Sequence, residues 1–269
     1  MNVFYLQGIA LFLSILFSVG CSMMGPRFPH ASVERSVNAT LWHRTSGEMI
    51  ALSHQAFNVA KMRLDEDLRT RGKGGKKRAL VVDVDETALD NSPYQVEAIM
   101  TGKGYPVGWK KWVEKAQAKP LPGAVDFFRY AASKGVDIFY ITNRKDQGAR
   151  REATIKNLER AGLPVNPEYV ILRKKDRSKI ERRGRVAKTH RIVLLFGDNL
   201  SDFHGDFDDL SLEDRKKAVE KRRKEFGDRF IVFPNPVYGD WEKAVYEGSF
   251  NRSEEEKAKM RKKALLSTR

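Results

Sequence analysis

Two aspartates, Asp83 and Asp85, stand one residue apart directly after an apolar run, in the stretch RALVVDVDETALDNSPY (residues 78–94). Two carboxylates ~5 Å apart in an effective dielectric of ~20 repel each other by roughly 3 kcal/mol. A protein retains such a pair when a positive group offsets the repulsion. The pair therefore indicates either a bound cation or an accidental arrangement.

Further polar residues follow other apolar runs. Thr142 and Asn143 end the second run, and Asp198 and Asp202 follow the fourth. We take these hydroxyl, amide and carboxylate groups as candidates for binding a substrate or a cation. The segment KKDRSKIERR adds three lysines to the same set, namely Lys174, Lys175 and Lys179.

The apolar runs have the length of strands and alternate with helical segments. The expected strands are residues 78–84, 136–142, 168–172, 191–197 and 229–233. The helices expected between them are residues 123–133, 147–161 and 212–224. This alternation predicts an α/β fold whose mainly parallel sheet of about five strands is covered by helices on both faces. Because ligands bind beyond the carboxyl ends of such strands, we expect the polar residues to meet at one edge.

The segments that flank this alternating region are helical in pattern. Residues 32–71 are expected to form one amphipathic helix, because apolar residues recur every three or four positions, at Met49, Leu52, Ala56, Ala60, Leu64 and Leu68. The glycine-rich stretch at 71–77 lacks the spacing of a phosphate-binding loop, so it is interpreted as a linker. The tail RSEEEKAKMRKKALLSTR is predicted to be a solvated helix of mixed charge.

The composition is that of a globular protein with a strong positive charge. The chain has 269 residues, is 41% hydrophobic and carries a formal charge of +15. A basic surface favours anionic partners, so one alternative is a non-enzymatic surface lipoprotein that binds nucleic acid, lipopolysaccharide or haem. The basic residues are scattered among acidic ones, and no nucleic-acid-binding motif is present.

The N-terminus has the pattern of an export signal. The first 26 residues carry no charge, and residues 9–19 are an apolar core of signal-peptide length. We expect a signal peptide at 1–20, lipidation of Cys21, and a lipidated linker at 21–31. An uncleaved membrane anchor built from residues 3–24 is the alternative. Either arrangement places the body of the protein in the cell envelope, and the lipid would attach it to a membrane.

The motifs together resemble a known enzyme superfamily. A strand ending in D-x-D-x-T, a strand ending in Thr, a downstream lysine and the sequence G-D-N-x-x-D resemble the four motifs of the haloacid-dehalogenase-like (HAD) phosphohydrolases. The stretches DVDETALDNSPY, WKKWVEKAQAKPLPGAVDFFRY, YITNRKD and GDNLSDF resemble, more specifically, the class C acid phosphatases, bacterial outer-membrane lipoproteins that are also called 5'-nucleotidases. The resemblance extends over about residues 41–248.

The resemblance implies a domain organisation. A Rossmann-like HAD core is expected at 78–235, with a helical cap inserted at 88–120. The N-terminal helical segment at 32–77, the cap and the C-terminal segment at 236–269 would form a smaller helical domain. The oligomeric state is left open.

The resemblance also implies catalytic roles. Asp83 would be the nucleophile that forms an aspartyl-phosphate, and Asp85 would be the general acid and base. Thr142 would donate a hydrogen bond to a phosphoryl oxygen, and a lysine would neutralise another oxygen. Lys179 fits the lysine motif best, and Lys175 is the alternative.

A carboxylate that attacks a phosphate dianion requires compensating positive charge, and Mg²⁺ suits an all-oxygen site. By resemblance, its ligands are the Asp83 carboxylate, the Asp85 backbone carbonyl and Asp198, with Asp202 orienting bound waters.

Two aromatic residues are expected to determine the substrate specificity. Trp109 and Tyr238 match the family's aromatic pair that sandwiches the base or nicotinamide ring, whereas Trp112 and Trp241 are interpreted as core residues. The expected function is that of a Mg²⁺-dependent acid phosphatase whose small-molecule substrates are nucleoside monophosphates, nicotinamide mononucleotide and aryl phosphates. A phosphotransferase is a second enzymatic alternative.

Overall fold

The computed structural model of this chain describes residues 36–70 and 75–267. The expected signal peptide, Cys21 and the lipidated linker lie outside the described residues, so these features stay predictions. Within the described segments, no helix combines the length and the apolar character that crossing a membrane requires.

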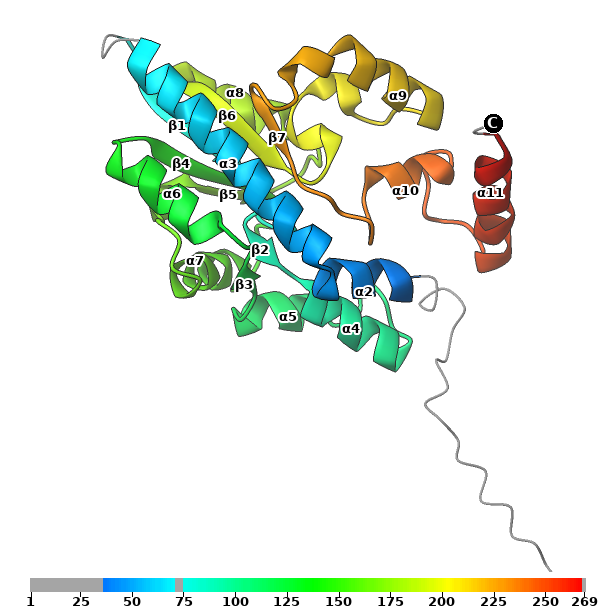
Figure 1. The fold of residues 1–269 in the computed structure, drawn as a ribbon. Helices are drawn as coiled ribbons and strands as arrows, with labels where there is room; N and C mark the ends of the chain where they lie inside the picture. The colour runs from blue at the N-terminus through cyan, green and yellow to red at the C-terminus, as the bar shows by residue number, and fades with distance from the viewer. Residues whose placement is uncertain (1–35, 71–74, 268–269) are drawn as a thin grey trace, which may run out of the picture.

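The centre of the molecule is a five-stranded sheet in which every neighbouring pair of strands is parallel (Figure 1). The strand order is β5-β4-β1-β6-β7. The strands are β1 (Lys77–Val82), β4 (Asp137–Lys145), β5 (Val170–Arg173), β6 (His190–Gly197) and β7 (Phe230–Val232). The predicted parallel sheet of five strands is therefore confirmed, and β1, which precedes the D-x-D motif, lies in the middle of it.

Helices cover both faces of the sheet, and the side chains of β1 alternate between the two. The helices of this core are α3 (Gly47–Thr70), α6 (Ala124–Ser133), α7 (Arg150–Arg160), α8 (Ile180–Thr189) and α9 (Leu212–Lys221). Leu80 and Val82 pack in one buried cluster with residues of α3 and α6, whereas Ala79 and Val81 pack in a second cluster with residues of α8 and α9. Helix α8 had no counterpart among the predicted elements.

The N-terminal segment differs from the single helix expected from its pattern. It forms α2 (Val37–Thr45) and α3, which are separated at Ser46. Ser46 is extended and its N–H closes the end of α2 by donating to the carbonyl of Trp42. The buried face of α3 also differs, because it includes Phe57 whereas Leu52 is 39% exposed.

The cap insertion forms two helices, α4 (Ser92–Thr101) and α5 (Trp109–Lys115). A short antiparallel pair, β2 (Leu89–Asp90) and β3 (Lys119–Pro120), closes its base, and this pair was not predicted. Helix α2 lies beside α4, so the N-terminal segment and the cap come together (Figure 1). Beyond β7 follow α10 (Asp240–Val245) and α11 (Glu254–Ser267). Helix α11 buries no residue, as expected for a solvated tail.

Helix α3 is attached to the sheet by an ionic cluster at the end opposite the D-x-D motif. Asp67 of α3 accepts hydrogen bonds from Arg78 of β1 at 2.6 Å and from Arg191 of β6 at 2.6 and 2.7 Å. Burial of the carboxyl opposes its ionisation, but the bonds from Arg191 and Arg78 outweigh burial and hold the pKa of Asp67 below its ordinary value. The ionised carboxylate therefore stabilises the folded chain.

We expect Asp67→Asn to lower the free energy of unfolding by about 2 kcal/mol at pH 6, because charge-assisted hydrogen bonds are lost. The pKa of Asp67 is lower in the folded than in the unfolded state. The stabilisation is thus complete above about pH 4 and disappears as pH falls through the folded pKa. Urea unfolding of both chains between pH 6 and pH 2 measures the difference. A difference that grows as pH falls would contradict this account.

Candidate active site

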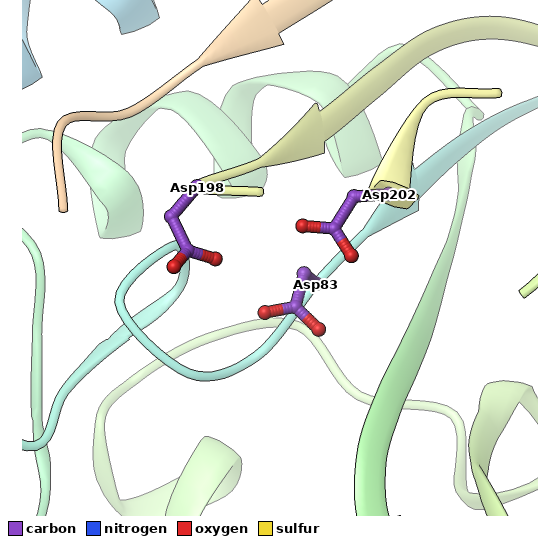
Figure 2. A group of neighbouring side chains, drawn as sticks. All are labelled: Asp83, Asp198 and Asp202. Atoms are coloured by element: carbon purple, nitrogen blue, oxygen red, sulfur yellow. The ribbon is translucent and has the colours of Figure 1, made fainter. Parts of the chain in front are cut away.

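Three carboxylates from different parts of the chain converge at the carboxyl edge of the sheet. Asp83 follows β1, Asp198 follows β6, and Asp202 lies in the short 3₁₀ turn after Asp198 (Figure 2). One carboxylate oxygen from each residue lies within 4.8 Å of the other two. Asp83 and Asp202 are buried, and Asp198 is half-buried. The parallel pairing of β1 with β6 explains the convergence of the two strand ends.

The close approach of Asp202 depends on a glycine. A Cβ atom at Gly197 would lie 2.5 Å from Oδ2 and 2.8 Å from Cγ of Asp202. Heavy atoms do not approach so closely without displacement. The last residue of β6 therefore has no side chain because the Asp202 carboxylate occupies that space.

Lys179 is the lysine that joins this cluster. Its ammonium group is paired with the carboxylate of Asp83 and, at 2.6 Å, with that of Asp202. Lys179 is 4% exposed, whereas Lys174 and Lys175 are exposed residues on the preceding loop. Of the lysines considered, only Lys179 reaches the carboxylates.

The cluster holds more negative than positive charge. Three carboxylates against one ammonium group leave two formal negative charges. Burial, opposed by Lys179 and reinforced by Asp202 and Asp85, raises the pKa of Asp83 to about 7. Asp198 keeps part of its surface exposed. Desolvation of its carboxyl group, and next the charges of Asp202 and Asp83, raise the pKa of Asp198 well above its ordinary value.

This imbalance suits a divalent cation. All the acidic groups offer oxygen ligands, which hard divalent cations prefer, and a double positive charge would match the formal excess. The amide of Asn235 donates to Oδ2 of Asp198 at 2.7 Å and so orients that carboxylate. The residues present therefore fit a hard divalent ion.

Asp85 lies in a different environment from Asp83. Its carboxylate accepts hydrogen bonds from Arg144, from the amide of Asn91 at 2.8 Å and from the hydroxyl of Thr142 at 3.3 Å. The side chain thus does not join the three-carboxylate cluster. The expected metal contact through its backbone carbonyl stays a prediction.

Sequence reasoning missed Arg144. This residue is 3% exposed, and its guanidinium contacts Asp85 through both Nε and Nη2. It directly follows Asn143 in YITNRKD, but a chain with 50 lysines and arginines offers no local signal that selects it. Only its contact with Asp85 identifies it as part of the site.

Asn143 lies beside Thr142 and is held by another missed arginine. Arg182 of α8 donates to the amide oxygen of Asn143 at 2.6 Å and to the backbone carbonyl of Thr142 at 2.7 Å. Arg182 is 6% exposed. Because α8 was not predicted, the burial of this arginine could not be foreseen.

The segment after β7 forms another part of the site. The Tyr238 hydroxyl is hydrogen-bonded to the buried carboxylate of Glu86, the residue after Asp85. Asp240 accepts hydrogen bonds from Asn199 at 2.7 Å and from Ser201 at 2.9 Å, in the turn that carries Asp202. With Asn235, these contacts attach the C-terminal segment to the acidic cluster, and none of them was predicted.

The three tryptophan residues singled out from the sequence have different surroundings. Trp109 is half-buried, and its ring centroid lies 5.8 Å from Cζ of Arg144. Trp112 is buried, as expected, and its indole N–H donates to Asn91 at 2.7 Å. The interpretation of Trp241 as a core residue was wrong, because it is 41% exposed on the short surface helix α10.

Comparison with known proteins gives one consistent answer. The family model of HAD superfamily subfamily IIIB (acid phosphatase) matches residues 22–241. The chain belongs to this acid phosphatase family. Two solved structures of the class C acid phosphatase from Bacillus anthracis, one of them a crystal structure with tungstate bound, share 49% sequence identity with it. Each superimposes with a TM-score of 0.82 over 86% of this chain and 96% of the other.

A plant enzyme is a more distant relative. Acid phosphatase 1 of Solanum lycopersicum is 29% identical over 133 residues, which are 46% of this chain and 51% of the plant protein. The match therefore spans about half of that enzyme. Membership of the family places the chain among the phosphomonoester hydrolases, and HAD enzymes use a divalent metal that the aspartate cluster can hold.

We expect Asp198→Asn to weaken divalent-cation binding at least tenfold, because a ligand and a negative charge are lost together. Gly197→Ala should weaken it comparably, because the added Cβ displaces Asp202 without removing any ligand. Isothermal titration with Mg²⁺, Mn²⁺ and Ca²⁺ measures both effects. The control is Asp176→Asn, an exposed acidic residue, and equal affinity in all four chains would exclude this cluster as the metal site.

Proposed function

We propose that this chain is a Mg²⁺-dependent acid phosphatase that hydrolyses small phosphomonoesters through an aspartyl-phosphate. The observation that carries the proposal is the buried cluster of Asp83, Asp198 and Asp202 with Lys179, at the carboxyl edge of a parallel sheet in a member of an acid phosphatase family. The Bacillus anthracis enzyme, whose fold matches, binds tungstate. Tungstate is a tetrahedral oxyanion like phosphate, which supports the same class of ligand here.

The reaction would proceed in two phosphoryl transfers. A carboxylate oxygen of Asp83 attacks phosphorus, the bond between phosphorus and the ester oxygen breaks, and Asp85 donates a proton to the departing oxygen. Asp85 then removes a proton from water, which attacks the aspartyl-phosphate. Phosphate leaves and the Asp83 carboxylate is restored, so each residue ends in its starting state.

Other residues would bind the phosphoryl group. The Thr142 hydroxyl and the Lys179 ammonium group lie beside the Asp83–Asp85 pair and offer donors to two phosphoryl oxygens. The amide oxygen of Asn143 is occupied by Arg182, so its NH₂ group is the part directed to substrate in this proposal. Asp83, Asp198 and the backbone carbonyl of Asp85 would hold Mg²⁺, with Asp202 orienting its bound waters, and the ion would supply positive charge that stabilises the developing negative charge on phosphate.

Substrates with a planar ring are proposed, in particular nucleoside monophosphates, nicotinamide mononucleotide and aryl phosphates. Trp109 contacts Arg144, the partner of Asp85, and Tyr238 contacts Glu86. Both rings therefore border the turn that carries the proposed acid. An aromatic face beside a phosphate site can stack on a base.

The cell envelope is the proposed location. The uncharged first 26 residues, the apolar core at 9–19 and the lone Cys21 support export followed by lipid attachment. In that location the enzyme would release nucleosides or nicotinamide riboside from phosphorylated precursors outside the cytoplasm.

We expect Asp83→Asn to reduce phosphate release from p-nitrophenyl phosphate at least ~10³-fold, because an amide cannot attack phosphorus. Removal of Mg²⁺ from the wild-type chain should reduce turnover similarly. Phosphate release at pH 5, with and without the metal, measures both, with Asp176→Asn as control. Wild-type turnover by the Asp83→Asn chain would exclude Asp83 as nucleophile, and added alcohols would reveal any phosphotransfer.

We expect Trp109→Ala and Tyr238→Ala each to raise KM for a nucleoside monophosphate roughly tenfold, because a stacked base contributes about 1–3 kcal/mol. KM for glycerol 2-phosphate, which has no ring, should change little. Steady-state kinetics on both substrates measure the contrast, and Trp241→Ala, at an exposed ring, is the matched control. Equal changes for the two substrates would contradict base stacking.

A further inference from the structure

We propose that Arg144 is a positioning residue that fixes the carboxyl group of Asp85 for proton transfer. The inference rests on the proposed function, because it assigns Asp85 the role of general acid. It goes further by assigning a role to a buried arginine to which the sequence motifs assign none.

The hydrogen bonds at Asp85 are unequal on its two oxygens. Oδ1 accepts from Arg144 Nη2 at 2.7 Å, from Arg144 Nε at 3.0 Å and from Asn91 Nδ2 at 2.8 Å. Oδ2 accepts from Arg144 Nε at 3.2 Å and from the Thr142 hydroxyl at 3.3 Å. Oδ1 is therefore saturated, and Oδ2 is the oxygen left to exchange a proton with the leaving group.

Arg144 can impose this orientation because it is itself held. Its side chain is 1% exposed, it follows Thr142 and Asn143 on β4, and its Nη1 donates to the Thr154 hydroxyl of α7 at 3.2 Å. A planar guanidinium that contacts both oxygens of a carboxylate fixes the plane of that carboxylate, which a lysine ammonium group cannot do.

The same guanidinium also contacts the cap. Its Cζ lies 5.8 Å from the ring centroid of Trp109, at the start of α5. Arg144 thus joins three parts of the molecule: the Asp85 turn after β1, helix α7 and the cap. Arg144 therefore links the position of Asp85, the proposed acid, to the cap, which is proposed to bind the substrate's ring.

An arginine near a phosphate site can instead bind the phosphate directly, and kinetics distinguish the two roles. A residue that positions the acid matters only when the leaving group needs a proton. p-Nitrophenolate is a stable anion and leaves without being protonated, whereas the alkoxide that leaves glycerol 2-phosphate must receive a proton. The quantity to compare is kcat/KM, because it reports the first irreversible step and is unaffected by later hydrolysis of the aspartyl-phosphate.

We expect Arg144→Lys to lower kcat/KM for glycerol 2-phosphate about 100-fold, the usual contribution of general acid catalysis. For p-nitrophenyl phosphate kcat/KM should change less than about threefold. Asp85→Asn should show the same contrast between substrates. Arg151→Lys, at an α7 arginine that bonds the carbonyls of Val170 and Pro167 outside the site, should show none. Arg144→Gln is a second variant, and its kcat/KM for p-nitrophenyl phosphate reports correct folding.

Four results would overturn the inference. Equal losses on both substrates would indicate a structural role only. A tenfold weaker inhibition by inorganic phosphate in the Arg144→Lys chain would indicate direct phosphate binding. Absence of turnover by the wild-type chain on either substrate would refute the proposed function, and the inference with it, whereas wild-type turnover with unchanged variants would refute the inference alone.

Discussion

The site depends on the burial of three carboxylates around one ammonium group. Asp83, Asp198 and Asp202 would repel one another strongly at such short range in a partly desolvated setting. Lys179 offsets part of this repulsion by bridging Asp83 and Asp202. Burial, reinforced by the neighbouring carboxylates, raises the pKa of both Asp83 and Asp198, and a divalent cation would remove the formal excess of negative charge.

The two aspartates of the D-x-D motif lie in different environments although only one residue separates them in sequence. Residues two positions apart in a regular strand point to the same face, but β1 ends at Val82 and the chain turns after it, with Glu86 at φ 56°. Asp83 is directed to Lys179 and the acidic cluster, whereas Asp85 is directed to Arg144, Asn91 and Thr142. The repulsion expected between the two is thus relieved by two different protein cations. This separation allows one carboxylate to serve as a nucleophile beside a metal and the other as a proton donor.

Elements outside the sheet complete the arrangement. Asn235, directly before the C-terminal segment, donates to Asp198, and Tyr238 of that segment contacts Glu86. The cap contacts Arg144 through Trp109. The parallel sheet therefore brings the reacting groups to one edge, and the cap and the C-terminal segment fix their orientation. In this arrangement the sheet supplies the reacting groups, and the cap and the C-terminal segment would determine which substrates bind.

The sequence by itself determined the five strands, their parallel arrangement and the polar residues at their carboxyl ends, because hydrophobic runs and their spacing are local properties of the chain. It also identified the family through motifs that lie at those ends. The tertiary structure decided which partners meet: Lys179 instead of Lys175, Arg144 on Asp85, Asn235 on Asp198, and Tyr238 on Glu86. The last three contacts join residues 59, 37 and 152 positions apart, and strand order and helix packing, which no local pattern encodes, bring such residues together.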